Sequence, residues 1–221
     1  PNVPEPDIEA VPEHAVDLLI NLLLQSDGDI TLVPTGPLTN IATAIRTEPA
    51  IVPKIKAISL MGGAIGLGNT TPAAEFNIWC DPEAAAIVFG CGRPITMAPL
   101  EVTHQALATE EVLQRLRAAQ RPVASFAADL LNFFADTYKQ VFGFPSPPVH
   151  DPCAVAAVIE PSIVKTKLMH VAIETTSELT VGRTVCDVYG KLGMEAHVQV
   201  GYALDVPRFW DLVIDTLLTY E

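Results

Sequence analysis

Three short apolar runs, each followed by a polar loop, constrain the fold of this 221-residue chain more than any other feature. They lie at residues 30–34, 55–61 and 95–100. Short apolar runs bounded by turn residues are typical of strands that are buried on both faces. Strand, loop and helix in repetition predict a sheet whose strands run mostly parallel. We therefore expect an α/β fold, with a mostly parallel sheet flanked by helices, in one domain over residues 1–221.

Helical periodicity fills much of the remaining chain. Asp81 and Thr109 are suited to cap the helices that follow them, and Pro82 fits a first helical position. A helix is expected over residues 12–25, another follows residues 35–40 and runs through about Arg46, and two more begin at Asp81 and Thr109. Further helices are expected over residues 121–141, 151–159 and 207–220. The C-terminal third is richer in β-branched residues, and we expect strands at residues 163–174, 179–189 and 196–204.

Charge and cysteine content exclude several classes of protein. The net charge is −13 with only 13 Lys and Arg, which argues against a nucleic-acid binder; an acidic surface that serves solubility is the plain alternative. No apolar run is long enough to span a membrane. The four cysteines form no C-x-x-C pair, so we expect free thiols in a reducing compartment. Since no signal peptide is recognisable, we expect a cytoplasmic protein.

The loops after the predicted strands are the expected ligand site, because ligands of parallel α/β sheets bind beyond the carboxyl ends of the strands. The loop MGGAIGLGNTTPAAEFNIWCDPE (residues 61–83) carries four glycines, but its spacing matches neither a phosphate loop nor a dinucleotide fingerprint. Asn69, Glu75 and Asn77 add one carboxylate and two amides, an inventory that suits sugar hydroxyls. Glu75 and Asn77 lie two apart, so an extended segment would point both the same way. For Asn69 alone, a solvated loop is an adequate alternative.

His150 and Asp151 follow a proline-rich loop and precede a predicted helix. Asp151 suits the N-cap of that helix. It equally suits an oxygen ligand of a hard cation, with His150 beside it as an acid. The dipeptide alone does not decide between these interpretations.

Together these segments resemble the inosine–uridine-preferring nucleoside hydrolase family. The stretches that carry the resemblance keep the family's order and spacing: LVPTGPLTNIATAI (32–45), ISLMGGAIGLGNTTPAAEFNIWCDPEAA (58–85), PLEVTH (99–104), VHDPCAVAAVI (149–159) and ETTSELTVGRTVCDV (174–188). The resemblance covers most of the chain and implies a Rossmann-like nucleoside hydrolase fold.

The resemblance implies one Ca²⁺ at the bottom of the site, with the backbone carbonyl of Thr35 and the carboxylate of Asp151 among its ligands. It also assigns residues to the substrate. Those matching the ribose side are Asn69, Glu75 and Asn77 for the hydroxyls, Met61 beside the sugar, and Phe76 packing against the ligand. On the base side, His150 matches a proton donor to the leaving base, and Tyr138 matches part of a lid.

The chain departs from the family pattern at its start. The family opens with an aspartate cluster of the form D-x-D-x-x-x-D-D, which supplies the general base and further calcium ligands. The aspartates of residues 1–30 show no such arrangement; they are Asp7, Asp17, Asp27 and Asp29. The family's N-terminal strands are thus missing from the expected fold. Three explanations stay open: a cleaved protein, a sequence that is only part of a longer chain, and a short homologue that binds without catalysing.

We therefore expect the intact protein to hydrolyse the N-glycosidic bond of ribonucleosides, releasing base and ribose in purine or pyrimidine salvage. The alternative is a non-catalytic nucleoside- or ribose-binding fragment, or an interaction subunit, because the aspartate cluster is absent. The resemblance further implies a dimer or tetramer, with a missing N-terminal fragment as one possible partner. The sequence does not decide between purine and pyrimidine bases.

Overall fold

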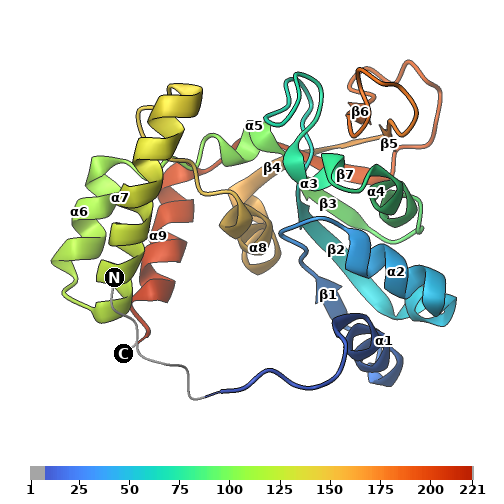
Figure 1. Cartoon of the computed structure of the whole chain (residues 1–221), viewed down its shortest axis with the longest axis horizontal. Helices are drawn as coiled ribbons and strands as arrows, with labels where there is room; N and C mark the ends of the chain where they lie inside the picture. Colours follow the sequence, from blue (N-terminus) through green and yellow to red (C-terminus); the bar gives the residue numbers. More distant parts are fainter. Residues whose placement is uncertain (1–7, 221) are drawn as a thin grey trace.

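The computed structural model describes residues 8–220, without the side chains of residues 136, 137 and 142 (Figure 1). Asp7 lies outside the described residues. Within them, five strands form one sheet in the order β1-β2-β3-β7-β4. They are β1 (Ile30–Leu32), β2 (Ile55–Met61), β3 (Ile95–Ala98), β7 (Val198–Leu204) and β4 (Val164–Met169). The first four run parallel, and β4 pairs antiparallel with β7. The expectation of a mostly parallel α/β sheet is confirmed.

Helices cover both faces of the sheet, as Figure 1 shows. One buried cluster joins the strands to α1 (Ala15–Gln25), α2 (Thr39–Thr47) and α4 (Pro82–Phe89). A second cluster joins them to α5 (Leu100–Thr103), α6 (Glu110–Ala118), α7 (Pro122–Phe142), α8 (Asp151–Ile159) and α9 (Val206–Leu217). Central strand residues such as Ile58 and Leu60 are at most 1% exposed, which explains why the strands read as continuous apolar runs.

The predicted helix starts at Asp81 and Thr109 are confirmed. The Asp81 carboxylate accepts a hydrogen bond from the Ala84 N–H at 3.0 Å, and the Thr109 hydroxyl accepts one from the Val112 N–H at 3.5 Å. The helix expected over residues 121–141 is α7, which ends at Gly143 in the left-handed conformation. Among residues 8–220, no helix is long and apolar enough to cross a membrane.

The strand predictions of the C-terminal third are partly wrong. The segment expected at residues 163–174 is divided between β4 and β5 (Val171–Ile173). Most of residues 179–189 is turn, and only β6 (Thr184–Cys186) is strand, paired with β5 in a separate two-stranded sheet. β-Branched residues favour strands only where neighbouring strands offer a surface to pack on, and most of this segment lacks one.

Short helices were missed. They are α3 (Phe76–Trp79), α5, and two 3₁₀ helices at Pro49–Lys54 and Pro161–Ile163. One or two helical turns are too short for apolar periodicity to show. Two of these, α3 and α5, directly follow loops at the carboxyl ends of β2 and β3, so they help to position the candidate site.

Candidate functional site

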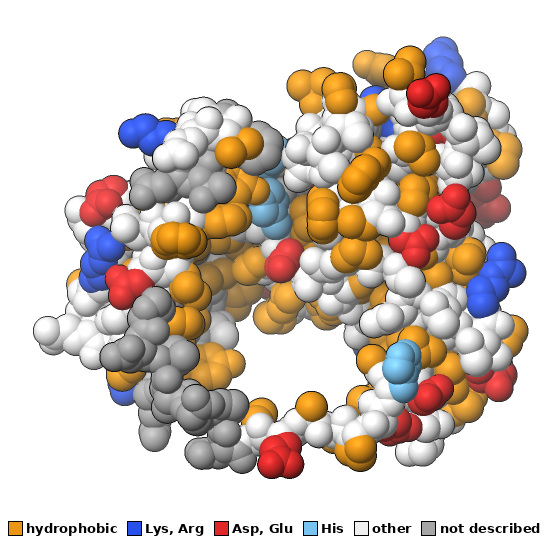
Figure 2. Space-filling view, viewed as in Figure 1, with side chains coloured by type: hydrophobic (Ala, Val, Ile, Leu, Met, Phe, Trp, Pro, Cys, Tyr) orange, Lys and Arg blue, Asp and Glu red, His pale blue; other side chains and the backbone are white. Residues whose placement is uncertain are grey.

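A cavity of about 340 Å³ opens at the carboxyl ends of β1 and β2, beside the start of α8. Its lining contains all nine residues predicted for the site and, in addition, Thr70: Thr35, Met61, Asn69, Thr70, Glu75, Phe76, Asn77, Tyr138, His150 and Asp151. Figure 2 shows histidine and acidic side chains within the hollow between the two halves of the molecule. Residues up to 116 positions apart in the sequence thus line one cavity, and their individual roles remain predictions.

Glu75 is directed mainly at the backbone. It is the N-cap of α3, is 2% exposed, and accepts hydrogen bonds from the N–H groups of Gly63 (2.8 Å) and Asn77 (2.9 Å). The prediction that residues 75–77 form an extended segment is therefore wrong, because Asn77 belongs to the helix that Glu75 caps. Burial raises the pKa of Glu75, the backbone hydrogen bonds oppose this shift, and the nearby charge of Asp151 adds to it.

The two asparagines present complementary groups. The Asn77 amide nitrogen donates to the carbonyl oxygens of Met61 (3.1 Å) and Thr35 (3.3 Å), which leaves its Oδ1 as the acceptor for a ligand. The Asn69 Oδ1 accepts from the Phe76 N–H at 3.0 Å, which leaves its Nδ2 as a donor. One donor and one acceptor at the same cavity can bind neighbouring hydroxyl groups of a sugar.

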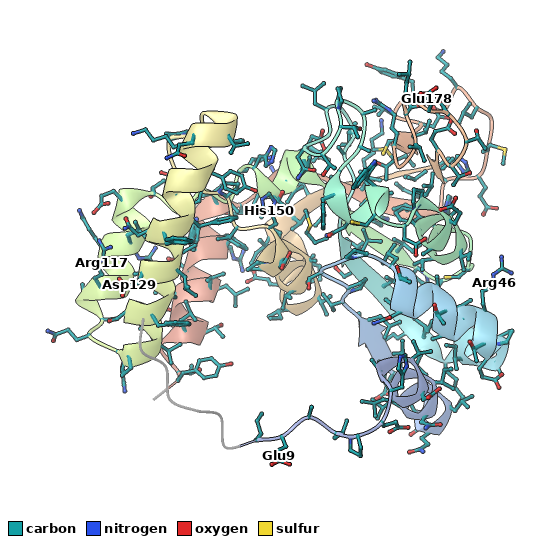
Figure 3. The ribbon with its side chains drawn as sticks, in the orientation of Figure 1. Glu9, Arg46, Arg117, Asp129, His150 and Glu178 are labelled. Atoms are coloured by element: carbon teal, nitrogen blue, oxygen red, sulfur yellow. The ribbon has the colours of Figure 1, made fainter. Side chains whose placement is uncertain are left out.

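His150 is fixed at both ring nitrogens. Its Nε2 lies 2.7 Å from the Tyr138 hydroxyl, and its Nδ1 lies 2.8 Å from the Thr103 hydroxyl. Figure 3 shows the labelled His150 beside the hollow, between α7 and α8. Burial, with a smaller contribution from His104, lowers the pKa of His150 to about 4, so the ring is neutral at pH 7. A neutral ring gives a proton to a leaving group only if it takes another at its second nitrogen.

The sequence interpretation missed the residues that surround this ring. Thr103 is fully buried, and the rings of His104 and Phe144 pack edge to face at 4.9 Å. His104 packs against His150 at 5.7 Å, and Phe144 against Tyr138 at 5.9 Å. The signal that could have found Thr103 and His104 is their position in the segment LEVTH, at the carboxyl end of β3.

Asp151 is the first residue of α8, and the N-cap position belongs to His150. The alternative of Asp151 as the N-cap is therefore wrong. Its carboxylate lines the cavity, and burial raises its pKa. Asp151 as a whole is exposed, so its carboxylate is only partly desolvated and is available to a cation or a hydroxyl donor in the cavity.

The oxygens of Asp151 and Thr35 fit Ca²⁺ in kind but not in number. Calcium takes six to eight oxygen ligands, whereas this part of the cavity offers one carboxylate and one carbonyl. Within residues 8–220, no three His, Cys, Asp or Glu side chains group closely enough to hold a metal ion. The described residues do not make a complete calcium site on their own.

Comparison with known proteins agrees with this geometry. The family model for inosine-uridine preferring nucleoside hydrolase matches residues 1–211. The pyrimidine-specific ribonucleoside hydrolase RihB of Escherichia coli strain E24377A is 46% identical over 212 residues, which cover 96% of this chain and 68% of that protein.

Solved structures show the same fold. A purine-preferring ribonucleoside hydrolase from Gardnerella vaginalis is 35% identical, with a TM-score of 0.89, and the match covers 99% of this chain and 69% of that one. An inosine–uridine preferring nucleoside hydrolase from Bacillus anthracis is 29% identical, with a TM-score of 0.76, over 94% of this chain and 66% of that one. The chain therefore belongs to the inosine–uridine preferring nucleoside hydrolase family, whose chemistry is hydrolysis of the N-glycosidic bond of nucleosides.

Proposed function

We propose that this protein binds a ribonucleoside in the cavity at the ends of β1 and β2 and cleaves the bond between ribose C1′ and the base. The observation that carries the proposal is the convergence of an amide donor (Asn69), an amide acceptor (Asn77) and two carboxylates (Glu75 and Asp151) on one cavity. This set matches the alternating donors and acceptors of ribose hydroxyls.

The charge of the cavity suits the reaction. As the bond from C1′ to the base nitrogen lengthens, its electron pair leaves with the base and positive charge develops on the sugar. Carboxylates fixed near that charge stabilise the transition state more than the ground state. Water then attacks C1′ and releases one proton, while the departing base takes up one, so the products are ribose and the free base. Glu75 and Asp151 interact electrostatically and lie beside the cavity, so they supply negative charge on the sugar side.

The paired side chains of Tyr138 and His150 are the proposed proton source for the base. Their 2.7 Å contact allows a proton to pass between the hydroxyl and Nε2, and Thr103 holds the opposite nitrogen. This arrangement lets a neutral ring act as a relay, which a pKa of about 4 requires at neutral pH.

We propose in addition that the active enzyme depends on Ca²⁺, with Asp151 and the Thr35 carbonyl as two of its ligands. The support is the pair of oxygens at one end of the cavity, which are of the type that calcium prefers. The remaining ligands would have to come from water, from ribose hydroxyls or from groups outside the described residues. Calorimetric titration with Ca²⁺ tests this assignment. The wild-type protein should give heat of binding, and Asp151→Asn should abolish it.

The direct test of the function is release of free base, measured by chromatography, from uridine, cytidine and inosine with added Ca²⁺. We expect uridine and cytidine to react faster than inosine, because the RihB relative at 46% identity is pyrimidine-specific. Asn69→Ala should lower kcat/KM, whereas Asn40→Ala, an exposed site on α2, should not. Equal rates for the two variants would refute the assignment of Asn69 to the sugar.

A nucleoside-binding protein without catalysis is the second candidate. It is favoured by the incomplete set of metal ligands among the described residues. Calorimetry with uridine distinguishes the two, because a pure binder gives heat of binding and releases no uracil. We also propose the dimer or tetramer that the family resemblance implies, which analytical ultracentrifugation tests.

A further inference from the structure

The backbone that leaves β2 is held by side chains at four successive positions, residues 63–66, which we term the clamped segment. Glu75 accepts from the Gly63 N–H at 2.8 Å, and Thr184 accepts from the Ala64 N–H at 2.9 Å. Glu101 accepts from the N–H groups of Ile65 and Gly66 at 2.9 and 2.8 Å. Three side chains from separate parts of the fold therefore accept the hydrogen bonds of this segment's N–H groups. In β2, the carbonyls of a neighbouring strand accept such bonds.

Thr184 makes the closest fit. It lies on β6, is 2% exposed, and its hydroxyl also donates to the Ala64 carbonyl at 2.6 Å. The Thr184 hydroxyl is thus hydrogen-bonded to both the N–H and the carbonyl of Ala64. Gly63 beside it has φ +75°, and a Cβ there would lie 2.7 Å from the Thr184 Cγ2. The backbone approaches Thr184 more closely than a side chain at position 63 would allow.

The loop between β2 and α3 contains the clamped segment and Asn69. The β5–β6 region contacts this loop near both of its ends. Besides Thr184, the Arg183 guanidinium donates to the Ile65 carbonyl at 3.5 Å. Gly182 packs against α3 so closely that a Cβ would lie 2.7 Å from the Cα of Trp79. In Figure 1 this loop lies between α5 and the β5–β6 sheet. Glu101 belongs to α5.

Between its ends the loop closes on itself. The Gly68 N–H donates to the Pro72 carbonyl at 3.2 Å, and the Asn69 N–H donates to the Ala74 carbonyl at 3.2 Å. Asn69 is therefore carried by a compact turn whose position depends on the two ends. Glu75 holds the far end by capping α3, and the clamped segment holds the near end.

We infer that Thr184 and Glu101 are positioning residues for the nucleoside site, acting through the clamped segment on the loop that presents Asn69. Neither side chain lines the cavity. The segment ETTSELTVGRTVCDV, which the proposed chemistry does not use, thereby gains a role at the ribose side of the site. The inference rests on the proposed function for the identity of the ligand, but the clamp itself can be measured without it.

A loosened loop weakens binding by a population effect. If the clamped segment is released, the loop holds Asn69 in place for only part of the time, and the apparent affinity falls in proportion to that fraction. A fall of the ordered fraction to one tenth would raise KM about tenfold while leaving the chemical step nearly unchanged.

The test compares three threonine variants of the whole chain. Thr184→Val keeps the shape of the side chain but removes the hydroxyl, whereas Thr184→Ser keeps the hydroxyl. Thr166→Val is the matched control, because its hydroxyl bonds Gln199 at 3.0 Å on β4 and β7, away from the loop. Hydrogen–deuterium exchange of residues 63–66 and steady-state kinetics with uridine are measured for each, after a cooperative thermal transition has shown that it folds.

We expect Thr184→Val to exchange these amides faster and to raise KM about tenfold, with kcat within about twofold of the wild type. Thr184→Ser and Thr166→Val should resemble the wild type. Glu101→Gln is a second route to the same result if Thr184→Val fails to fold, because an amide can replace only one of its two acceptor oxygens.

Unchanged exchange in both Thr184→Val and Glu101→Gln would overturn the clamp. Faster exchange with unchanged KM would overturn the positioning role and leave a purely structural contact. If the wild-type chain neither binds nor cleaves uridine, the proposed function fails, and the exchange data still decide whether these side chains hold the segment.

Discussion

Replacing Gly63 by alanine tests the close approach between the ribose-side loop and β6. The residue has φ +75°, a conformation that costs an L-residue with a Cβ about 1–2 kcal/mol. The added Cβ would also lie 2.7 Å from the Thr184 Cγ2 and 3.1 Å from the Met97 Sδ. Both neighbours are buried, so something must move to make room.

The magnitude follows from these two contributions. Overpacking of a well-packed interior costs about 1–3 kcal/mol, in addition to the backbone strain. We therefore expect Gly63→Ala to lower the free energy of unfolding by about 2–5 kcal/mol. For a chain of this size, that corresponds to a fall in Tm of roughly 5–15 °C.

Urea denaturation followed by circular dichroism measures the change, and Gly92→Ala is the matched control. Gly92 has φ +77° but no atom within 4 Å of its added Cβ, so this substitution should cost only the strain of about 1–2 kcal/mol. Adding Thr184→Ser to Gly63→Ala removes the nearest methyl group and should restore part of the loss. If Gly63→Ala lowers the free energy of unfolding no more than Gly92→Ala does, the close contact between Gly63 and Thr184 on β6 is refuted.

Four further predictions concern single side chains. Asp81→Ala removes the acceptor of the Ala84 N–H and should lower the free energy of unfolding by about 1–2 kcal/mol in urea denaturation; no change would contradict the cap. Tyr138→Phe removes the hydroxyl beside His150 and should lower kcat about five- to tenfold in the uracil-release assay with little change in KM, and an unaltered kcat would exclude it from proton transfer. Asp151→Asn should abolish Ca²⁺ binding in calorimetry, and retained binding would place the ion elsewhere. The pKa of His150 is lowered to about 4 in the folded protein, so its contribution to stability is complete above about pH 6.5 and is lost as the pH falls towards 4. Over that range, the free energy of unfolding of the wild type should fall by up to about 3 kcal/mol relative to His150→Gln. Parallel pH profiles of the two proteins would refute the shift.

The long elements were predictable because their signals are local. The strand expected at residues 55–61 is β2, and the helix expected to begin at Asp81 is α4, which that residue caps. A buried strand needs apolar residues on both faces, and a helix start needs a cap, so both leave marks in the sequence. The strand expected over residues 179–189 failed because pairing partners, and not composition, decide where a strand forms.

The sequence also predicted which residues come together, since all nine line one cavity, and their roles in binding stay predictions. It did not predict their hydrogen bonds. Glu75 was expected to share its direction with Asn77 along an extended segment, whereas it caps the helix to which Asn77 belongs. Thr103 and Thr184 carry no signal of their own, because a threonine is common in any fold and gains a role only from its neighbours.

The sequence by itself determined the parallel α/β class, the family, and the residue types that line the candidate cavity, because periodicity, capping and motif spacing are properties of neighbouring positions. Only the tertiary structure decided which atoms of these residues remain available. The Asn77 amide nitrogen is taken by the carbonyls of Thr35 and Met61, and the N–H groups of residues 63–66 are taken by three distant side chains. Hydrogen bonds between residues up to 120 positions apart depend on how the helices and the β5–β6 sheet pack around the main sheet, and no local pattern records that packing.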